Sequence, residues 1–180
     1  MNLLERAASI GVEGFMHPNE LEKLAELATG NDVLEIGSFK GLSTWAMALV
    51  AKSVMSVDTH KANSAGQFQV NEHTTLEDFR RAISGLNNVA YYVGSSEDAH
   101  RNGLVSPHCT EWNMIFLDAM HTYEDVKADI ERWYPVLKQG GLMVFHDYDH
   151  PHFPGVKQAV DERLGVLNNT VGTLAWLIKQ

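Results

Sequence analysis

The sequence predicts an α/β protein: a three-layer sandwich around a mostly parallel, seven-stranded sheet. Three observations support this prediction. From Asn31 onward, short β-branched and apolar runs alternate with helical patterns, which is typical of a parallel sheet with helices on both faces. Paired glycines, Gly37 and Gly41, follow the first apolar run. The last residues, from Val166 to Ile178, indicate an antiparallel C-terminal hairpin with its turn at Asn168-Asn169.

Two helical patterns precede the sheet. They cover about Asn2 to Ile10 and Pro18 to Ala28, and Pro18 suits a first helical position because its missing N–H would be unpaired there in any case. We expect residues 1–30 to form an N-terminal helical cap on a single domain that spans residues 1–180.

Strands and helices then alternate along the chain. The predicted strands are Asp32–Ile36, Ser53–Val57, Val89–Val93, Asn113–Leu117 and Leu142–Phe145. The predicted helices run from about Leu42 to Val50, Thr75 to Ser84, Ser95 to Gly103, Thr122 to Leu137 and Gly155 to Leu164. Thr75 and Thr122 each begin a capping-box pattern, and Gly140-Gly141 is expected to stop the helix before the fifth strand. Residues 60–74 are predicted to form a long loop, of a length that is often functional.

Composition and charge exclude several classes of protein. At 180 residues the chain suits one domain, and Cys109 is its single cysteine, so no intrachain disulfide can form. The net charge of -9, without a basic cluster denser than Arg80-Arg81, disfavours a nucleic-acid partner. No run approaches the roughly 20 apolar residues of a membrane span, and the N-terminus lacks a signal-peptide core. We expect a cytoplasmic protein without a membrane partner, and a homo-oligomer is left open.

The turn after the first strand, Glu35 to Gly41, indicates a ligand site. Its glycines let the backbone approach a ligand closely, and the next helix presents free amides; alternatively, they only satisfy the dihedrals of a tight turn. Phe39 excludes the three-glycine dinucleotide motif, and no Gly-Lys-Ser/Thr closes a phosphate loop. Asp58 ends the second strand 21 residues beyond Gly37, where it can bond ribose hydroxyls. This pairing fits a ligand that carries a nucleoside.

These residues resemble the cofactor motif of class I S-adenosylmethionine-dependent methyltransferases, which have a Rossmann-like fold. The resemblance implies that Gly37 and the neighbouring backbone contact the methionine portion of S-adenosylmethionine, that Glu35 supports the loop and that Asp58 binds the ribose. Ser95 and Ser96, after the third strand, match the family position near the adenine. The cofactor-binding residues that the resemblance implies are Glu35, Gly37, Ser38, Gly41, Asp58, Ser95 and Ser96.

Acidic and histidine side chains follow the fourth and fifth strands. Asp118 and His121 follow one, and His146 and Asp147 follow the other. Since ligands lie beyond the carboxyl ends of parallel strands, all four should face the same crevice. They could be loop residues that cap the next helix or decorate a surface turn. The functional interpretation is a divalent-metal site, with carboxylates from Asp118 and Asp147 and an imidazole from His146.

The spacing here resembles a narrower group, which includes metal-dependent O-methyltransferases of macrolide sugars. The shared pattern runs from Asp118 to Asp129 and continues to the Gly-Gly strand that ends in His-Asp. It implies that Asp118 and Asp147 hold magnesium and that His121 is the catalytic base. His146 departs from the pattern, because the metal-binding relatives have a carboxylate there, and this leaves open a different metal or none.

The sequence therefore predicts an S-adenosylmethionine-dependent methyltransferase that acts on a small molecule, with O-methylation of a hydroxyl and divalent-metal assistance as the finer expectation. Two alternatives stay open: a nicotinamide-dependent oxidoreductase, and a non-catalytic Rossmann-like binding module. Asp129 is interpreted as a solvated or salt-bridged carboxylate. His150 and His152, on either side of Pro151, are assigned to a surface loop.

Overall fold

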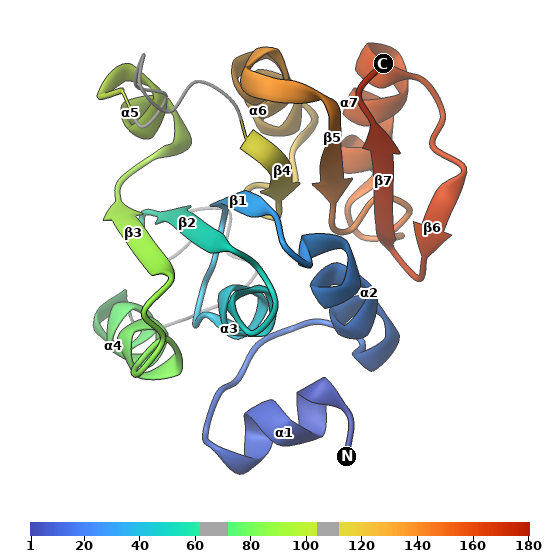
Figure 1. The fold of residues 1–180 in the computed structure, drawn as a ribbon. Helices are drawn as coiled ribbons and strands as arrows, with labels where there is room; N and C mark the ends of the chain where they lie inside the picture. Colours follow the sequence, from blue (N-terminus) through green and yellow to red (C-terminus); the bar gives the residue numbers. More distant parts are fainter. Residues whose placement is uncertain (62–71, 104–111) are drawn as a thin grey trace.

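A computed structural model describes residues 1–61, 72–103 and 112–180 of the chain. The strands are β1 (Asp32–Ile36), β2 (Ser53–Asp58), β3 (Val89–Val93), β4 (Trp112–Leu117), β5 (Leu137–Phe145), β6 (Asn169–Val171) and β7 (Leu174–Ile178). They form one seven-stranded sheet in the order β3-β2-β1-β4-β5-β7-β6 (Figure 1). Strands β1 to β5 pair in parallel, and β7 runs antiparallel to both β5 and β6. This confirms the predicted fold class.

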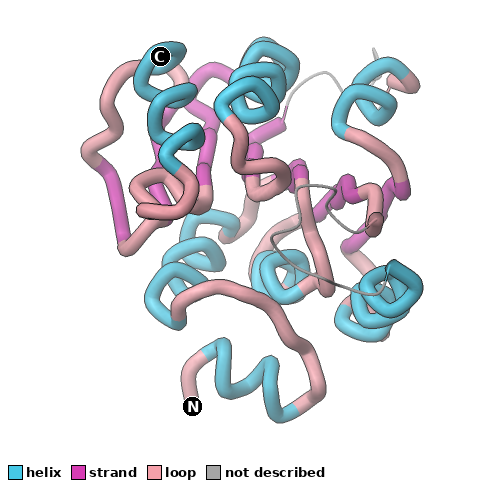
Figure 2. The backbone as a smooth tube through the Cα atoms, turned by 180° about the vertical axis from the view of Figure 1, so that it is seen from behind, coloured by secondary structure: helices cyan, strands magenta, loops and turns pink. Residues whose placement is uncertain are grey.

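Helices cover both faces of the sheet. They are α1 (Leu3–Ser9), α2 (Pro18–Ala28), α3 (Leu42–Ala48), α4 (Glu72–Ala82), α5 (Ser96–Arg101), α6 (Tyr123–Trp133) and α7 (Pro154–Leu164). Helices α2, α3 and α4 lie on one face, and α5, α6 and α7 lie on the other (Figure 1), as the view from behind also shows (Figure 2). In the described part of the chain, none of these helices combines the length and the apolar character that a membrane span needs.

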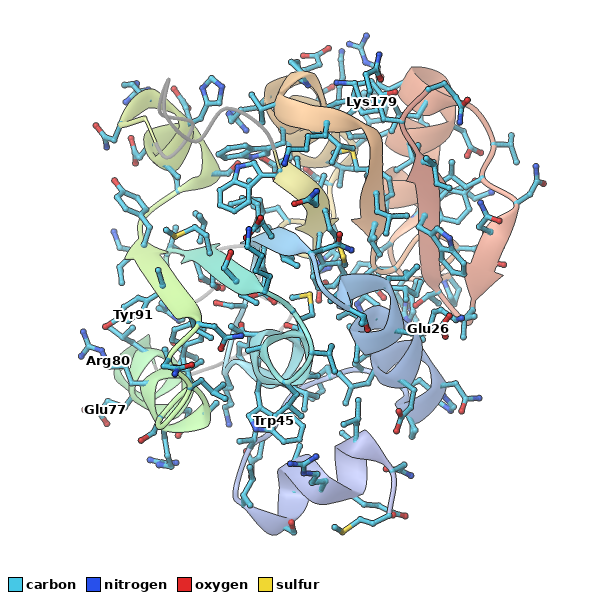
Figure 3. The ribbon with its side chains drawn as sticks, viewed as in Figure 1. Glu26, Trp45, Glu77, Arg80, Tyr91 and Lys179 are labelled. Atoms are coloured by element: carbon cyan, nitrogen blue, oxygen red, sulfur yellow. The ribbon has the colours of Figure 1, made fainter. Side chains whose placement is uncertain are left out.

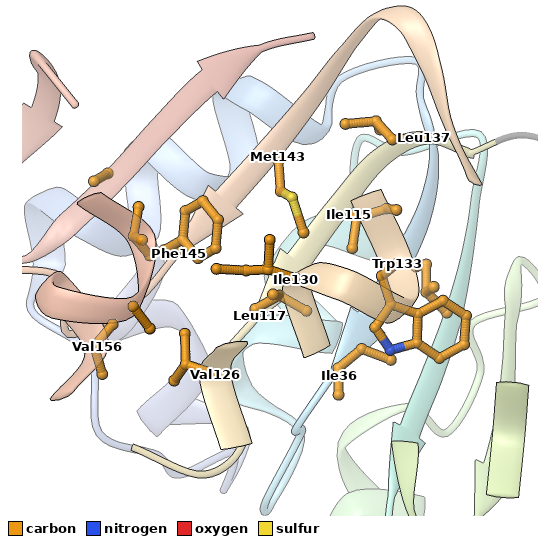
Figure 4. Close-up of a cluster of buried hydrophobic side chains, with 14 of the residues drawn as sticks. Ile36, Ile115, Leu117, Val126, Ile130, Trp133, Leu137, Met143, Phe145 and Val156 are labelled. Atoms are coloured by element: carbon orange, nitrogen blue, oxygen red, sulfur yellow. The ribbon is translucent and has the colours of Figure 1, made fainter. Parts of the chain in front are cut away.

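Two apolar clusters hold the layers together. The central strands are apolar on both faces because helices bury both faces. Figure 4 shows the cluster between the sheet and helices α6 and α7, where Trp133 and Phe145 are almost completely buried. The second cluster lies under α2 and α3 and includes Leu24, Met47 and Phe116. Together they fix the strand ends that carry the polar side chains of the site.

Helix α1 packs beneath α3 at the edge of the molecule. Trp45 of α3 is 4% exposed, and the guanidinium of Arg6 lies 5.7 Å from its ring centroid, in the region where Figure 3 places Trp45 between the two helices. At the far edge of the sheet, Arg80 Nε donates to the hydroxyl of Tyr91 at 2.9 Å (Figure 3). The contact of Arg6 with Trp45 shows that the N-terminal helix α1 packs onto the sheet domain.

Two predicted helix boundaries are wrong. Helix α4 begins at Glu72 rather than at Thr75, so Thr75 lies inside it, where its hydroxyl donates to the carbonyl of His60 at 3.0 Å. Residues 62–71 of the predicted loop lie outside the described residues. Helix α6 ends at Trp133, because a 3₁₀ turn containing Pro135 follows and β5 begins at Leu137.

The predicted glycine stop and hairpin turn are also misplaced. Gly140-Gly141 lies within β5 and not after a helix, close to a register shift against β4, and the φ of Gly140 is 74°. The hairpin turns at Gly172 and Thr173, and not at Asn168-Asn169. Gly172 has a φ of 60°, which a glycine tolerates without strain, so the turn moves to it and Asn169 starts β6. Cys109 lies outside the described residues.

Candidate active site

A cavity of about 1560 Å³ opens at the carboxyl ends of the parallel strands. The residues that line it include Gly37 after β1, Asp58 from β2, Asp118 after β4 and His146 after β5. The strand order reverses between β1 and β4, and a crevice forms at such a switch point because the loops on either side diverge. Residues that are far apart in the sequence therefore face one space.

The two glycines of the β1 turn have different roles. Gly37 lines the cavity with a φ of 91°, and a Cβ there would overlap the carbonyl oxygen of Asp118. Its close approach to the end of β4 therefore requires a glycine. Gly41 is absent from the cavity wall; it caps α3 with a φ of 90°, beside Phe79.

Asp58 holds this turn through backbone amides. Its carboxylate accepts from the amides of Ser38 at 2.7 Å, Phe39 at 2.8 Å and His60 at 2.6 Å. Each carboxylate oxygen has two lone pairs, so acceptor capacity remains for a ligand in the cavity. The sequence indicated a ribose contact for Asp58, and the structure adds a loop-holding role.

Glu35 lies behind the turn and not in the cavity wall. It is fully buried and accepts hydrogen bonds from the hydroxyls of Ser43, at 2.6 Å, and Thr44. Burial raises its pKa to about 7 against the effect of these hydroxyls. Glu35 thus supports the start of α3. Ser38 does line the cavity, and its buried hydroxyl has no hydrogen-bond partner among the described residues.

Ser95 and Ser96 lie at the cavity wall after β3. Ser95 caps α5 by accepting from the amide of Asp98 at 3.0 Å. The hydroxyl of Ser96 donates to Asp129 and accepts from the indole of Trp133 at 2.7 Å. Both serines already stabilise the fold, and both are half-buried at the cavity wall.

Asp129 forms a salt bridge, which was one of the two alternatives that the sequence left open for it. Its carboxylate lies 2.6 Å from Arg132, and burial raises its pKa. It is also 7% exposed and lines the cavity, so it is not solvated. The sequence could not show this, because the burial comes from α6 packing against α5.

The acid and histidine side chains after β4 and β5 meet as predicted. His121 Nε2 lies 3.1 Å from Asp147 Oδ2 and 3.6 Å from Asp118 Oδ1. Burial would lower the pKa of His121, but the two carboxylates outweigh it and raise the pKa to about 9. Asp147 has a φ of 57°, which is uncommon for a residue other than glycine and is typical of functional turns.

His146 lies between carboxylates. Its Nδ1 is 3.2 Å from Asp118 Oδ1, and its Nε2 is 3.3 Å from Glu20 Oε2. Burial alone would lower the pKa of His146, but these charges and hydrogen bonds raise it to about 11. In turn, His146 and His121 outweigh the effect of burial on Asp118 and hold its pKa at about 2.

Glu20 is the site residue that the sequence did not indicate. Its carboxylate accepts from the amide of Thr173 at 2.6 Å, from the Thr173 hydroxyl at 3.0 Å and from the amide of His17 at 3.0 Å. It is 5% exposed and has its pKa lowered to about 2, because the bonds from His146 and Thr173 outweigh the desolvation. One carboxylate therefore joins α2, the β6–β7 turn and the end of β5. Its local bond, from the amide of His17, is an ordinary helix cap, and its partners in the site, His146 and Thr173, are remote in the sequence, so no sequence signal indicates its role.

Three of these groups could hold a metal ion. Ligand atoms of Asp118, His121 and Asp147 lie within 4.8 Å of one another, and all three residues line the cavity. Two carboxylates and an imidazole suit a divalent cation. His146, which the sequence predicted as a ligand, is outside this group: its Nδ1 lies 3.2 Å from Asp118 and its Nε2 lies 3.3 Å from Glu20, so both ring nitrogens already face carboxylates.

His150, His152 and Phe153 also line the cavity. His152 is exposed and His150 half-buried, so the loop is at the surface, as expected, but it forms part of the wall. The Phe153 ring stacks on His121 at 4.3 Å and on His150 at 4.9 Å between centroids. Flat rings therefore extend from the acidic cluster along one side of the cavity.

Comparisons with known proteins agree with this architecture. A protein family described as a methyltransferase domain matches residues 34–148. A curated relative, the uncharacterized protein R132 of Acanthamoeba polyphaga mimivirus, is 27% identical over 155 residues, which are 82% of this chain and 66% of that protein. The chain thus spans just under two thirds of the length of this relative.

Solved structures show the same fold at low identity. The O-methyltransferase TomG from Streptomyces achromogenes, solved in complex with SAM, gives a TM-score of 0.72 at 19% identity and covers 100% of this chain and 91% of its own. An O-methyltransferase from Bacillus cereus, solved with SAH, gives 0.68 at 17%, with 98% and 89% covered. The O-methyltransferase NovP gives 0.65 at 16%, with 90% and 80% covered.

The sheet order, the glycine turn after β1 and the acid at the end of β2 define a class I methyltransferase with a Rossmann-like fold. Because the family match covers more than half of the chain, the protein belongs to the methyltransferase-domain family. This membership decides against the nicotinamide-dependent oxidoreductase.

Proposed function

We propose that the protein transfers a methyl group from S-adenosylmethionine to a hydroxyl of a small-molecule acceptor. One observation carries the proposal: the glycine turn with Asp58 and the cluster of Asp118, His121 and Asp147 line the same cavity. A methyl donor and an acceptor can therefore meet between them. A cytoplasmic location and the lack of a nucleic-acid partner belong to this proposal.

The cofactor side is formed by the turn after β1 and the ends of β2 and β3. Gly37 permits close approach of backbone, Ser38 offers an unpartnered hydroxyl, and Asp58 retains acceptor capacity for ribose hydroxyls. Ser95 and Ser96 stand where the adenine is expected. When bound, S-adenosylmethionine supplies a methyl group on a positively charged sulfur, which leaves as a neutral thioether.

His121 is the proposed general base on the acceptor side. It would take the hydroxyl proton as the oxygen forms its bond to the methyl carbon, so that no charge is left on the product. Only a neutral imidazole can do so, whereas the carboxylates of Asp118 and Asp147 raise the pKa of His121 to about 9. Activity near neutral pH therefore requires that the charge of these carboxylates be offset.

Asp118 and Asp147 are the residues proposed to hold a divalent cation, with His121 beside them. Such an ion, magnesium or another, would lower the pKa of an acceptor hydroxyl and help to orient it. His146 has a different proposed role. Held between Glu20 and Asp118, its imidazolium fixes the Asp118 carboxylate in place.

The test is a mass-spectrometric screen of hydroxylated metabolites with the full chain and S-adenosylmethionine. We expect one acceptor class to gain one methyl group, and Asp118→Asn to abolish this gain while S-adenosylhomocysteine still binds. Wild-type turnover by Asp118→Asn that a chelator leaves unchanged would exclude the metal role. A cavity that binds the cofactor but methylates no hydroxyl would contradict the proposed reaction.

A further inference from the structure

Glu20 is a buried carboxylate of the cavity wall that the proposed reaction does not use directly. It lines the cavity from α2 and is 5% exposed. It lies outside the group of Asp118, His121 and Asp147 that could hold a cation. An ionised carboxylate is costly to bury without partners, so the partners of Glu20 indicate what it does.

Four partners among the described residues fix the Glu20 carboxylate in one orientation. Its Oε1 accepts from the amide of Thr173 at 2.6 Å and from the Thr173 hydroxyl at 3.0 Å. Its Oε2 accepts from the amide of His17 at 3.0 Å and lies 3.3 Å from His146 Nε2. Gly172 packs so closely against the same carboxylate that a Cβ there would overlap it. Since each carboxylate oxygen has two lone pairs, these partners use the acceptor capacity of Glu20.

The other ring nitrogen of His146 faces the proposed cation ligands. Nδ1 lies 3.2 Å from Asp118 Oδ1 and 3.5 Å from Asp147 Oδ2. The amide of His146 donates to the carbonyl of Leu117 at 3.1 Å, which fixes the backbone, so the ring can turn only about its side-chain bonds. Turning would separate Nε2 from Glu20. Glu20 therefore sets the direction in which Nδ1 points.

We propose that Glu20 is a positioning residue of the active site: it orients His146, and His146 orients the Asp118 carboxylate that is proposed to hold the cation. This inference rests on the proposed function, and it adds α2 and the β6–β7 turn to the parts that set the affinity for the cation. Hydrogen-bond partners one step behind a metal ligand fix its direction, and their loss typically weakens metal binding about 10- to 100-fold. Glu20 also balances the positive charge of His146, which would otherwise repel a cation at Asp118.

Calorimetric titration of the full chain, saturated with S-adenosylhomocysteine, with Mn²⁺ tests the proposal. We expect Glu20→Gln and Glu20→Asp each to raise the dissociation constant for Mn²⁺ about tenfold, with the affinity for S-adenosylhomocysteine unchanged. Glu20→Asp keeps the charge but shortens the side chain, so it separates position from charge. Glu26→Gln, which removes an exposed carboxylate of the same helix that is paired with Lys23, is the matched control and should bind Mn²⁺ as the wild type does.

A second background shows whether the effect passes through His146. In His146→Asn the side-chain amide can still donate to Asp118 but is too short to reach Glu20. Adding Glu20→Gln to this variant should therefore change the Mn²⁺ dissociation constant by less than about twofold, because coupled residues are not additive. If the Glu20 variants do not fold, Thr173→Val removes one donor to the carboxylate and should raise the same constant about threefold.

Wild-type Mn²⁺ affinity in the folded Glu20 variants, or in Thr173→Val where it replaces them, would overturn the positioning role. An equal effect of Glu20→Gln with and without His146 would also overturn it. Both outcomes leave the proposed function in place. A wild-type chain that binds S-adenosylhomocysteine but no Mn²⁺ is a different result, because it removes the cation from the proposed function and the positioning role with it.

Discussion

Glu35 makes the stability of the protein depend on pH in a way that one substitution should remove. Burial raises the folded-state pKa of this glutamate from 4.5 to about 7. Because the folded state binds this proton more tightly than the unfolded state, proton binding by Glu35 stabilises the fold. This contribution is fully present below the unfolded pKa of 4.5 and is lost as the pH rises from there through the folded-state pKa of about 7. A shift of this size corresponds to about 3 kcal/mol of unfolding free energy. Glu35→Gln cannot ionise and should lose this dependence.

Urea unfolding of wild-type protein and Glu35→Gln between about pH 5 and pH 8 measures the effect. The difference in unfolding free energy between the two should change by about 3 kcal/mol in favour of the variant as the pH rises. Contributions of His121 and His146 cancel in this difference. Glu77→Gln, at an exposed position of α4, should give a curve parallel to wild type. Parallel curves for Glu35→Gln as well would refute a buried, protonated Glu35.

Three further substitutions test the site. Gly37→Ala should weaken S-adenosylhomocysteine binding in calorimetry by at least about tenfold, because its Cβ overlaps backbone; Gly30→Ala, also at positive φ but with open space, should cost only about 1 kcal/mol of stability and no affinity. Glu20→Gln should lower the unfolding free energy by about 3 kcal/mol, measured in urea, because His146 loses a buried charged partner; an unchanged value would show that this pair is not coupled. His121→Ala should reduce turnover in single-turnover assays and leave cofactor affinity unchanged, whereas an equal loss of both would remove it from the acceptor side.

The strands and the glycine turn were predictable because their signals are local. Alternating apolar runs mark β1 to β5, and Gly37 with Asp58 marks the cofactor edge, since parallel strands deliver their carboxyl ends to one side. The same rule predicts that Asp118, His121, His146 and Asp147 lie close together. Their convergence follows from the parallel strand topology, whichever residues follow the strands.

What the sequence did not show depends on contacts between remote segments. In the sequence, Glu20 is indistinguishable from an ordinary acidic residue in the first turn of a helix. Only tertiary packing brings it to His146 and Thr173. The bonds to Asp58 from the amides of Ser38 and Phe39, which are remote from it in the sequence, were not predictable for the same reason. The hairpin turn was misplaced because Gly172 at positive φ is compatible with a tighter turn than the asparagine pair suggested.

Calorimetric titration of the folded full chain with S-adenosylmethionine tests the central claim most directly. We predict saturable binding at one site, weakened at least about tenfold in Asp58→Asn because the amide cannot accept from all three backbone donors, and no binding of a nicotinamide dinucleotide. Absence of S-adenosylmethionine binding by the natively folded chain, or binding of the nicotinamide dinucleotide instead, would contradict the account.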